Sequence, residues 1–278
     1  MKFAIDLPVH SHFADPNLLL DLALEAEASG WDGVFLWDHI NWFGKSPRLT
    51  DPWITLAAIA AKTERIKIGT MVTPLSRRRP WKLARETVAL DHLSKGRLIL
   101  GVGLGASPKL EFATFGEVED AVLRAERLDE SLQLLQAFWS GEKVSFNGKH
   151  YQVEDVAFLP TPLQIPRIPI WVAGYWPNKR PLRRAARWDG VFSLQSGSGF
   201  KKMMQPATVA DVKDYVELHR SNQEPFEVIH WGISSGNPAE DQPVYEQYEA
   251  AGATWWLENF NPSRGSLKQL RSRISRGP

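Results

Sequence analysis

The sequence predicts an α/β fold, a (β/α)8 TIM barrel that takes up residues 1–278 as a single domain. Eight short apolar segments alternate with helical patterns, as in parallel strands joined by crossover helices. The length suits a barrel, which typically needs about 250 residues. Trp31-Asp32-Gly33-Val34-Phe35 also returns as Trp188-Asp189-Gly190-Val191-Phe192, four predicted strands later. A doubled half-barrel would give this spacing, but a shared helix-to-strand turn explains five residues more simply. An open doubly wound sheet is the alternative fold.

The predicted strands are short runs rich in β-branched and aromatic residues. They cover residues 3–7, 33–37, 66–72, 97–102, 170–173, 191–194, 227–233 and 254–257. The predicted helices cover residues 17–29, 51–62, 80–93, 121–139, 241–251 and 262–274. Pro52 and Pro80 stand at the first helical position, which proline favours. Gly30, Gly141 and Gly252 follow the ends of three helices, where glycine is a common stop signal.

Residues 141–169 interrupt this alternation between the fourth helix and the fifth strand. Asn147-Gly148 lies between two alternating runs, and Asn-Gly is the strongest short signal for a β-hairpin. A proline-rich passage follows the second run. We therefore predict a hairpin excursion on the surface of the domain rather than a second domain.

Composition excludes several classes of function. The 33 basic and 32 acidic side chains give a net charge of +1, so no basic surface is predicted for nucleic acid or an anionic membrane. The chain has no cysteine, which rules out disulfides and thiolate metal sites and favours a cytoplasmic location. We find no signal peptide and no apolar run near the ~20 residues of a membrane-spanning helix. We expect the partner to be a small-molecule substrate.

The most informative motif is Asp38-His39 at the end of the second predicted strand. A buried parallel strand can carry an acid and an imidazole only at its carboxyl end, where barrels bind ligands. Imidazole titrates near neutral pH, so His39 could exchange a proton with a substrate or cofactor. Neighbouring strand residues point to opposite faces, so only one of the pair can face the mouth. A capping aspartate beside a packed histidine is the structural alternative.

Glycine-rich strand ends suggest a site for an anion. Gly101-Val102-Gly103-Leu104-Gly105 follows the fourth strand, and Ala173-Gly174-Tyr175 ends the fifth, its neighbour in a barrel. Backbone without side chains can approach a phosphate closely. Glycines that let the barrel bend are the alternative. The run Arg77-Arg78-Arg79 after the third strand could meet an anionic cofactor tail, although a solvated loop or subunit contact is the commoner explanation.

The motif His10-Ser11-His12 after the first strand is typical of metal-dependent hydrolases. A catalytic zinc site needs three or more ligands, and the fifth and sixth strand ends supply no histidine. We therefore predict no metal. Several of the 12 tryptophans fall in or just after strands, so some could line one mouth. The predicted substrate pocket consists of Trp37, Trp42, His10 and Trp231.

In this order, the motifs resemble the bacterial luciferase-like superfamily of flavin- and deazaflavin-dependent oxidoreductases. The segments that carry the resemblance are 30–39, 68–74 with 78–80, 90–97, 100–105 and 169–174. It covers nearly the whole chain and is weakest over the last seventy or so residues. The resemblance implies a TIM barrel with the ring of FMN or coenzyme F420 at its carboxyl mouth.

The resemblance also implies the roles of several residues. The segment Thr70-Met71-Val72 would pack behind the ring, with a non-proline cis peptide between Met71 and Val72. Cofactor phosphate would lie at Gly103, Leu104 and Gly105 and at Ala173, Gly174 and Tyr175. His39 would be the acid or base near the site of hydride transfer, and Asp38 would tune or orient it. The family also implies a homodimer.

The choice of cofactor rests on two positions. The pair Asp38-His39 resembles the deazaflavin enzymes, and Leu104 stands where FMN enzymes of the luciferase type tend to have an arginine. Both favour F420 and hydride transfer to or from a small organic substrate. An FMN-dependent monooxygenase of the same superfamily is the alternative. A flavin-binding protein without catalytic activity is the alternative from another class.

Overall fold

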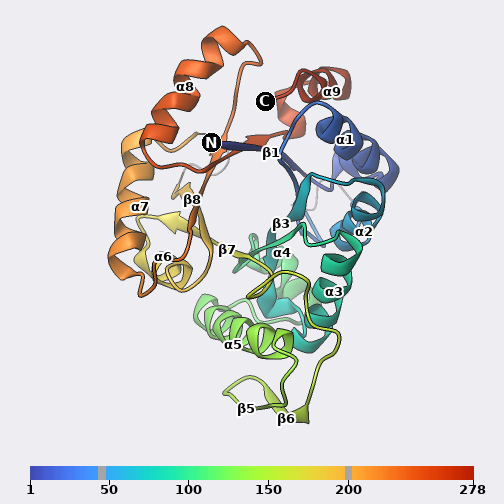
Figure 1. Ribbon diagram of the computed structural model, residues 1–278, viewed down its shortest axis with the longest axis vertical. Coiled ribbons are helices and arrows are strands. Elements are labelled where there is room, and N and C mark those ends of the chain that lie inside the picture. Colours follow the sequence, from blue (N-terminus) through green and yellow to red (C-terminus); the bar gives the residue numbers. More distant parts are fainter. Residues whose placement is uncertain (43–47, 198–201) are drawn as a thin grey trace.

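The computed structural model describes residues 1–42, 48–197 and 202–278, and it confirms the predicted barrel. Parallel strands close in the order β1-β10-β9-β8-β7-β4-β3-β2 (Figure 1). Their bounds are β1 (Lys2–Leu7), β2 (Gly33–Leu36), β3 (Lys67–Pro74), β4 (Leu98–Gly103), β7 (Ile170–Trp176), β8 (Gly190–Gln195), β9 (Glu227–Gly232) and β10 (Trp255–Asn259). Each predicted strand is present, with ends that differ by up to three residues from the predicted ones.

The helices cover the outside of the barrel, with α1 to α3 and α6 to α8 on opposite sides in Figure 1. They are α1 (Pro16–Ala28), α2 (Pro52–Lys62), α3 (Pro80–Leu93), α4 (Pro108–Glu111), α5 (Ala121–Trp139), α6 (Lys179–Ala185), α7 (Pro206–His219), α8 (Pro238–Ala250) and α9 (Leu267–Ser275). Asp15, Asp51 and Asp120 cap α1, α2 and α5 by accepting backbone N–H bonds. The sequence analysis did not identify α6 and α7.

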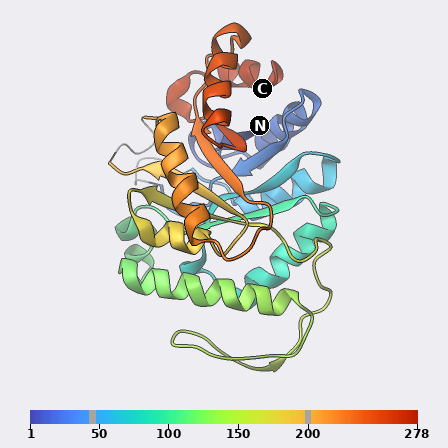
Figure 2. The same cartoon turned by 60° about the vertical axis from the view of Figure 1, so that its left-hand side comes forward.

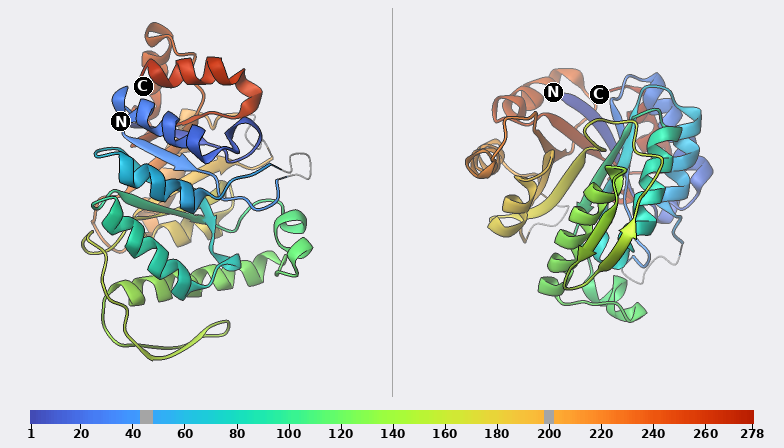
Figure 3. Two further views of the ribbon diagram at one scale, coloured as in Figure 1. Left: turned by 90° about the vertical axis from the view of Figure 1, so that its right-hand side faces the viewer. Right: turned by 60° about the horizontal axis from the view of Figure 1, so that its bottom comes forward.

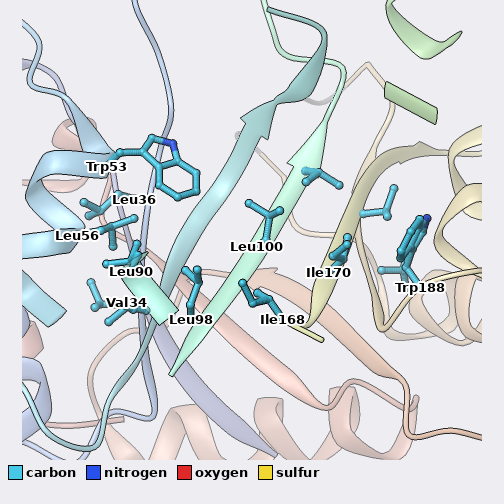
Figure 4. Packing of buried hydrophobic residues seen from close by; sticks show 14 of the residues in the cluster. Val34, Leu36, Trp53, Leu56, Leu90, Leu98, Leu100, Ile168, Ile170 and Trp188 are labelled. Atoms are coloured by element: carbon cyan, nitrogen blue, oxygen red, sulfur yellow. The ribbon is translucent and has the colours of Figure 1, made fainter. Parts of the chain in front are cut away.

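Alternation along the strands divides the apolar side chains into two layers. Outward residues pack under the helices; Figure 4 shows Leu36 and Leu100 in the same cluster as Trp53 and Leu56 of α2. Inward residues fill the barrel, where Phe35, Trp171 and Trp255 pack with ring centroids 5.1–6.2 Å apart. The interior is therefore a solid core below the mouth, as expected for an eight-stranded barrel.

The repeated pentapeptide forms the same turn twice. Asp32 exchanges hydrogen bonds with the backbone of Phe3: its own N–H donates to the Phe3 carbonyl, and its Oδ2 accepts from Phe3 N at 2.8 Å. Asp189 does the same with Ile170, whose N–H lies 2.7 Å from Asp189 Oδ2. Each aspartate thus fixes the start of one strand against the next. The repeat is explained by this shared turn and requires no duplication.

The hairpin excursion consists of β5 (Val144–Asn147) and β6 (Gln152–Val156), which run antiparallel. Figures 2 and 3 show it beside α5, away from the barrel strands. Asn147 pairs with Gln152, so residues 148–151 form the loop in place of a tight Asn-Gly turn. Glu130 of α5 accepts three loop N–H bonds, from Lys149, His150 and Tyr151, at 2.8–3.0 Å. Glu130 of α5 therefore fixes the backbone conformation of the hairpin loop. Within the described ranges, no helix is long and apolar enough to cross a membrane.

Candidate functional site

A cavity of roughly 770 Å³ opens at the carboxyl end of the barrel strands. This volume is typical of small-molecule and cofactor sites. Twelve of the predicted site residues line it: Trp37, Asp38, His39, Trp42, Met71, Val72, Gly103, Leu104, Gly105, Ala173, Gly174 and Tyr175. Strand ends from β2, β3, β4 and β7 thus meet as the barrel prediction requires.

Three predicted residues lie behind the cavity wall. Thr70 is buried and joins β3 to β4 through a 3.2 Å hydrogen bond from its hydroxyl to the Gly101 carbonyl. Trp231 belongs to the barrel interior. His10 is buried and stacks on Trp42, with the two ring centroids 5.1 Å apart. They pack behind the residues that line the cavity, and their contacts with cofactor or substrate stay predictions.

His39 occupies the end of the second strand with its imidazole at the cavity. Its Nδ1 lies 2.9 Å from Oε1 of Glu111, the last residue of α4, which is completely buried. An ionised carboxylate can only accept hydrogen bonds, so Nδ1 carries the hydrogen of this pair. Nε2 of His39 makes no hydrogen bond to a described residue. The arrangement leaves Nε2 to exchange a proton with a bound molecule.

Glu111 stays ionised in spite of its burial. Burial alone would raise the pKa of Glu111, but the hydrogen bond and charge of His39, the charge of Arg77 and the Asn41 N–H hold it below the usual range. Arg77 Nη1 donates to Glu111 Oε2 at 2.7 Å. The sequence analysis missed Glu111. It lies 72 positions from His39, so no pattern in the chain indicated the pairing.

Asp38 belongs to the same buried network but does not contact the imidazole through a hydrogen bond. Its Oδ1 accepts from Arg77 at 2.9 Å, and its Oδ2 accepts from Arg78 at 2.8 Å and Thr73 at 2.9 Å. Burial would raise the pKa of Asp38, but Arg78 and Arg77 outweigh burial and lower it. Asp38 therefore does not orient His39 through a hydrogen bond, as the sequence analysis expected. The carboxylate that is bonded to Nδ1 of His39 is that of Glu111.

The arginine run after β3 has an internal role. Arg77 and Arg78 form ion pairs with Asp38, and Arg77 also pairs with Glu111. The guanidinium of Arg79 lies 5.9 Å from the ring centroid of Trp81. The suggestion that this run meets an anionic cofactor tail is therefore not supported. Arg77 and Arg78 compensate the two buried carboxylates beside the catalytic candidate.

Aromatic rings surround His39 on the side of β1 and β2. The ring centroid of Trp42 lies 4.3 Å from that of His39, and Trp37 lies 5.8 Å from it in an edge-on contact. Burial, together with the charge of His39, lowers the pKa of His10 to about 4, so His10 is neutral at pH 7. The indoles of Trp37 and Trp42 therefore place aromatic surface next to the imidazole of His39 in this part of the wall.

Asp6 supports Trp37 from inside the barrel. Trp37 Nε1 donates to Asp6 Oδ2 at 2.9 Å, and both side chains are buried. Burial raises the pKa of Asp6 to about 8, only partly offset by hydrogen bonds from Trp37 and Asn259. The carboxyl group is therefore mainly protonated at pH 7 and acts as a neutral hydrogen-bond acceptor for the indole.

Asp6→Asn is expected to make the protein more resistant to alkali. The folded pKa of Asp6 exceeds the unfolded value, so its contribution to stability is complete below about pH 4 and is lost as pH rises through 8. Between pH 5 and 7, the free energy of unfolding of the wild type should fall by about 2–3 kcal/mol more than that of the variant. The variant keeps a hydrogen-bond acceptor for Trp37, because the asparagine side chain has a carbonyl oxygen. Urea unfolding at both pH values measures this difference. Equal pH dependence of the two proteins would contradict it.

The two glycine-rich strand ends lie side by side, since β4 pairs with β7. A Cβ on Gly103 would lie 2.9 Å from Val72, and Gly105 has a φ of +81° against Phe112. Close packing therefore requires both glycines, and both also line the cavity. The peptide bond between Met71 and Val72 is cis, which confirms the expectation drawn from the resemblance.

Basic side chains line the cavity near α6. Arg184 and Arg187 pair with Asp129 of α5, and Arg183 donates to the Tyr215 hydroxyl at 2.9 Å. Arg180 lines the same region and is exposed. The sequence analysis missed these residues. The signal was the basic segment that begins at Lys179, four residues after Tyr175.

No metal centre is found in the part of the chain that the structure describes, where His, Asp and Glu side chains form no group of three able to hold an ion. The cavity instead combines an apolar end at His39 with a basic end at α6. A flat, partly anionic organic molecule matches both ends.

Comparisons with known proteins agree with this geometry. A family model described as luciferase-like monooxygenase matches residues 1–206. An F420-dependent glucose-6-phosphate dehydrogenase of Microbacterium testaceum is 38% identical over 168 residues, which are 58% of this chain and 48% of that protein. An F420-dependent hydroxymycolic acid dehydrogenase of Mycobacterium tuberculosis is 33% identical over 62% of this chain and 48% of its own length. The chain thus spans about half the length of the curated relatives that it matches.

Solved structures support the fold over the whole chain. An F420-dependent secondary alcohol dehydrogenase, solved with an F420–acetone adduct, superimposes with a TM-score of 0.80. The match covers 100% of this chain and 98% of that chain at 15% sequence identity. At this identity the likeness establishes the barrel architecture and no more.

Proposed function

Because this chain belongs to the luciferase-like monooxygenase family, we propose that it is an F420-dependent oxidoreductase that transfers hydride to or from a small organic substrate. The observation that carries the proposal is the imidazole of His39 at the cavity, with Nδ1 bound to buried Glu111 and Nε2 free of hydrogen bonds to described residues. The relatives named as F420-dependent dehydrogenases support the choice of cofactor.

The residues of the cavity fit such a cofactor. Met71, Val72 and Leu104 offer apolar walls for a flat ring, while Arg180 and Arg124 offer positive charge for an anionic tail. A bound deazaflavin would supply hydride chemistry, for which no side chain is equipped. The protein would hold and orient the cofactor and keep its environment dry.

The chain's own residues would handle the proton. His39 would give or take it at Nε2, because Glu111 holds the hydrogen at Nδ1. Trp37 and Trp42 would exclude water from the reacting groups. Arg77 would keep Glu111 ionised and in place. We also propose a homodimer in the cytoplasm, as the resemblance implies, and light scattering of the purified protein tests the dimer.

An FMN-dependent monooxygenase is the second candidate, and one observation favours it. One of the two positions that favour F420 is Leu104, which stands where FMN enzymes of the luciferase type tend to have an arginine. Arg124 of α5 brings a guanidinium to the backbone of that residue, where its Nη1 donates to the Leu104 carbonyl oxygen at 2.6 Å. An arginine therefore lies beside the glycine segment, which weakens the preference for F420 over FMN.

Titration of the purified protein with F420 and with FMN tests the proposal. We expect F420 to bind with a change in its absorbance and fluorescence, and FMN to bind at least tenfold more weakly. Binding of FMN alone would favour the monooxygenase. Binding of neither would contradict both candidates, whereas tight binding of F420 without turnover of any alcohol or carbonyl substrate would favour a non-catalytic carrier.

A further inference from the structure

A second cavity, of roughly 210 Å³, lies between α9 and the loops that follow β9 and β10. Among the described residues, it shares no lining residue with the large cavity at His39. Its wall contains three arginines, Arg264, Arg273 and Arg276, and none of the described residues that line it is acidic. The cavity is smaller than a typical cofactor site, and the charge of its wall favours an anion.

Two of these arginines approach the same point of the backbone. Arg273 lies in the last turn of α9, and Arg276 follows the helix directly, three positions later, so both side chains lie on one face. A side chain on Gly236, in the loop after β9, would begin 3.3 Å from Nε of Arg273 and 3.4 Å from Nη1 of Arg276. Two guanidinium groups therefore meet at this loop, where their like charges repel each other.

The acidic groups nearby do not face the cavity. Glu258 is completely buried and pairs with Arg264 at 2.6 Å. Asp241 accepts two backbone N–H bonds, from Ser235 and Gly236, at 2.7–2.8 Å. Neither carboxylate belongs to the cavity wall. Arg264 is therefore the one arginine of the three that has a carboxylate partner among the described residues.

Arg273 and Arg276 differ in how firmly the protein holds them. Arg273 is only 8% exposed, and its Nε and Nη2 donate to the hydroxyl of Ser234 at 3.0 and 2.8 Å. The guanidinium of Arg276 is on an exposed residue and makes no hydrogen bond or ion pair to a described residue. Arg273 is thus a fixed, buried cation that bonds to a neutral group, and a buried cation without a counter-ion is costly. An anion in the cavity would remove this cost.

We propose that the three arginines bind a phosphate group, as the free ion or at the end of a small metabolite, between α9 and the loop after β9. Guanidinium groups present N–H donors in a plane that matches the oxygens of phosphate. Arg273 would supply the fixed charge, and Arg276 would bring its free donors from the rim. Arg264 connects the site to the barrel, since its Nη2 donates to the Ser234 carbonyl at 2.8 Å. The bound anion would thus join α9 to the ends of β9 and β10. This site does not depend on the proposed function.

Calorimetric titration with inorganic phosphate and with glycerol 3-phosphate, at constant ionic strength in chloride, tests the site. Arg276→Gln is expected to weaken binding by about tenfold or more, because charge-assisted hydrogen bonds are lost. The variant should unfold at the wild-type temperature without phosphate, since the guanidinium of Arg276 has no partner in the described fold. Arg271→Gln is the matched control and should bind like the wild type. It removes a charge from the same helix, but Arg271 pairs with Glu25 of α1, which lies beside α9 in Figure 1.

The two ligands distinguish the sources of the phosphate group. Tighter binding of inorganic phosphate would indicate the free ion, and tighter binding of the ester would indicate a phosphorylated metabolite; both support the site. Equal binding in the wild type, Arg276→Gln and Arg271→Gln would place the phosphate elsewhere and overturn the inference. Equal weakening in both variants would show a general effect of charge and would also overturn it, as would the absence of binding to the wild type at millimolar concentrations.

Discussion

His39→Asn is expected to lower turnover by about a hundredfold or more while the cofactor still binds. Asparagine can still donate an amide hydrogen toward Glu111, so the buried carboxylate keeps a partner, but it cannot exchange a proton at the position of Nε2. Steady-state turnover and cofactor fluorescence, measured on the same preparation, separate the two effects. The proposal expects a large fall in kcat with an unchanged dissociation constant.

The control for this substitution is His12→Ala. His12 is exposed in the short helix η1 (Ser11–Phe13), so its loss should leave kcat and cofactor binding unchanged. His39→Ala should resemble His39→Asn in turnover. Wild-type turnover in both His39 variants would remove the imidazole from the mechanism, and loss of cofactor binding in both would give it a binding role instead.

Glu111→Gln is expected to impair both activity and stability. The two oxygens of Glu111 accept from donors on both sides, His39 Nδ1 on one and Arg77 Nη1 on the other. The amide of glutamine has only one oxygen, so its NH2 group must face either His39 or Arg77. If it faces His39, Nδ1 can no longer donate and the imidazole loses its fixed tautomer. If it faces Arg77, two donors point at each other. Breaking a buried charged pair of this kind costs about 3–5 kcal/mol, and we expect turnover to fall at least tenfold.

Urea unfolding as a function of pH distinguishes the charge of Glu111 from its shape. The pKa of Glu111 is lowered on folding, so its stabilisation is present above the ordinary glutamate pKa of 4.5 and is lost as pH falls through the folded value. The Gln variant should lack this acid-side loss. Glu117→Gln, at an exposed carboxylate 3.7 Å from Arg127, is the control and should behave like the wild type. Wild-type stability and kcat in Glu111→Gln would contradict the role given to the pair.

The barrel could be predicted from the sequence because its signals are local. Each strand is an apolar run, and proline or glycine marks the ends of several helices. The helix α6 was missed because it has only seven residues and contains Pro181, too short a segment to show a helical pattern. The hairpin was predicted from Asn147-Gly148, but its loop geometry depends on Glu130, a residue on another element.

The candidate site could be predicted only where a strand end contributes the residue directly. His39 and the glycine segments are of this kind. Glu111 and Arg124 are not, because the helices that follow the strand bring Glu111 to His39 and Arg124 to the cavity. The resemblance implied that Asp38 tunes or orients His39, whereas the fold pairs its carboxylate with Arg77 and Arg78. Pairings between distant segments leave no periodic trace in a single chain.

One short stretch of backbone serves both ends of the site. It begins at Gly103, which lines the cavity, and ends at Glu111, which holds the imidazole. Under the proposed function, a chimera that takes this stretch from a relative would change cofactor binding and proton transfer together. A change meant for only one of the two has to be made outside residues 103–111.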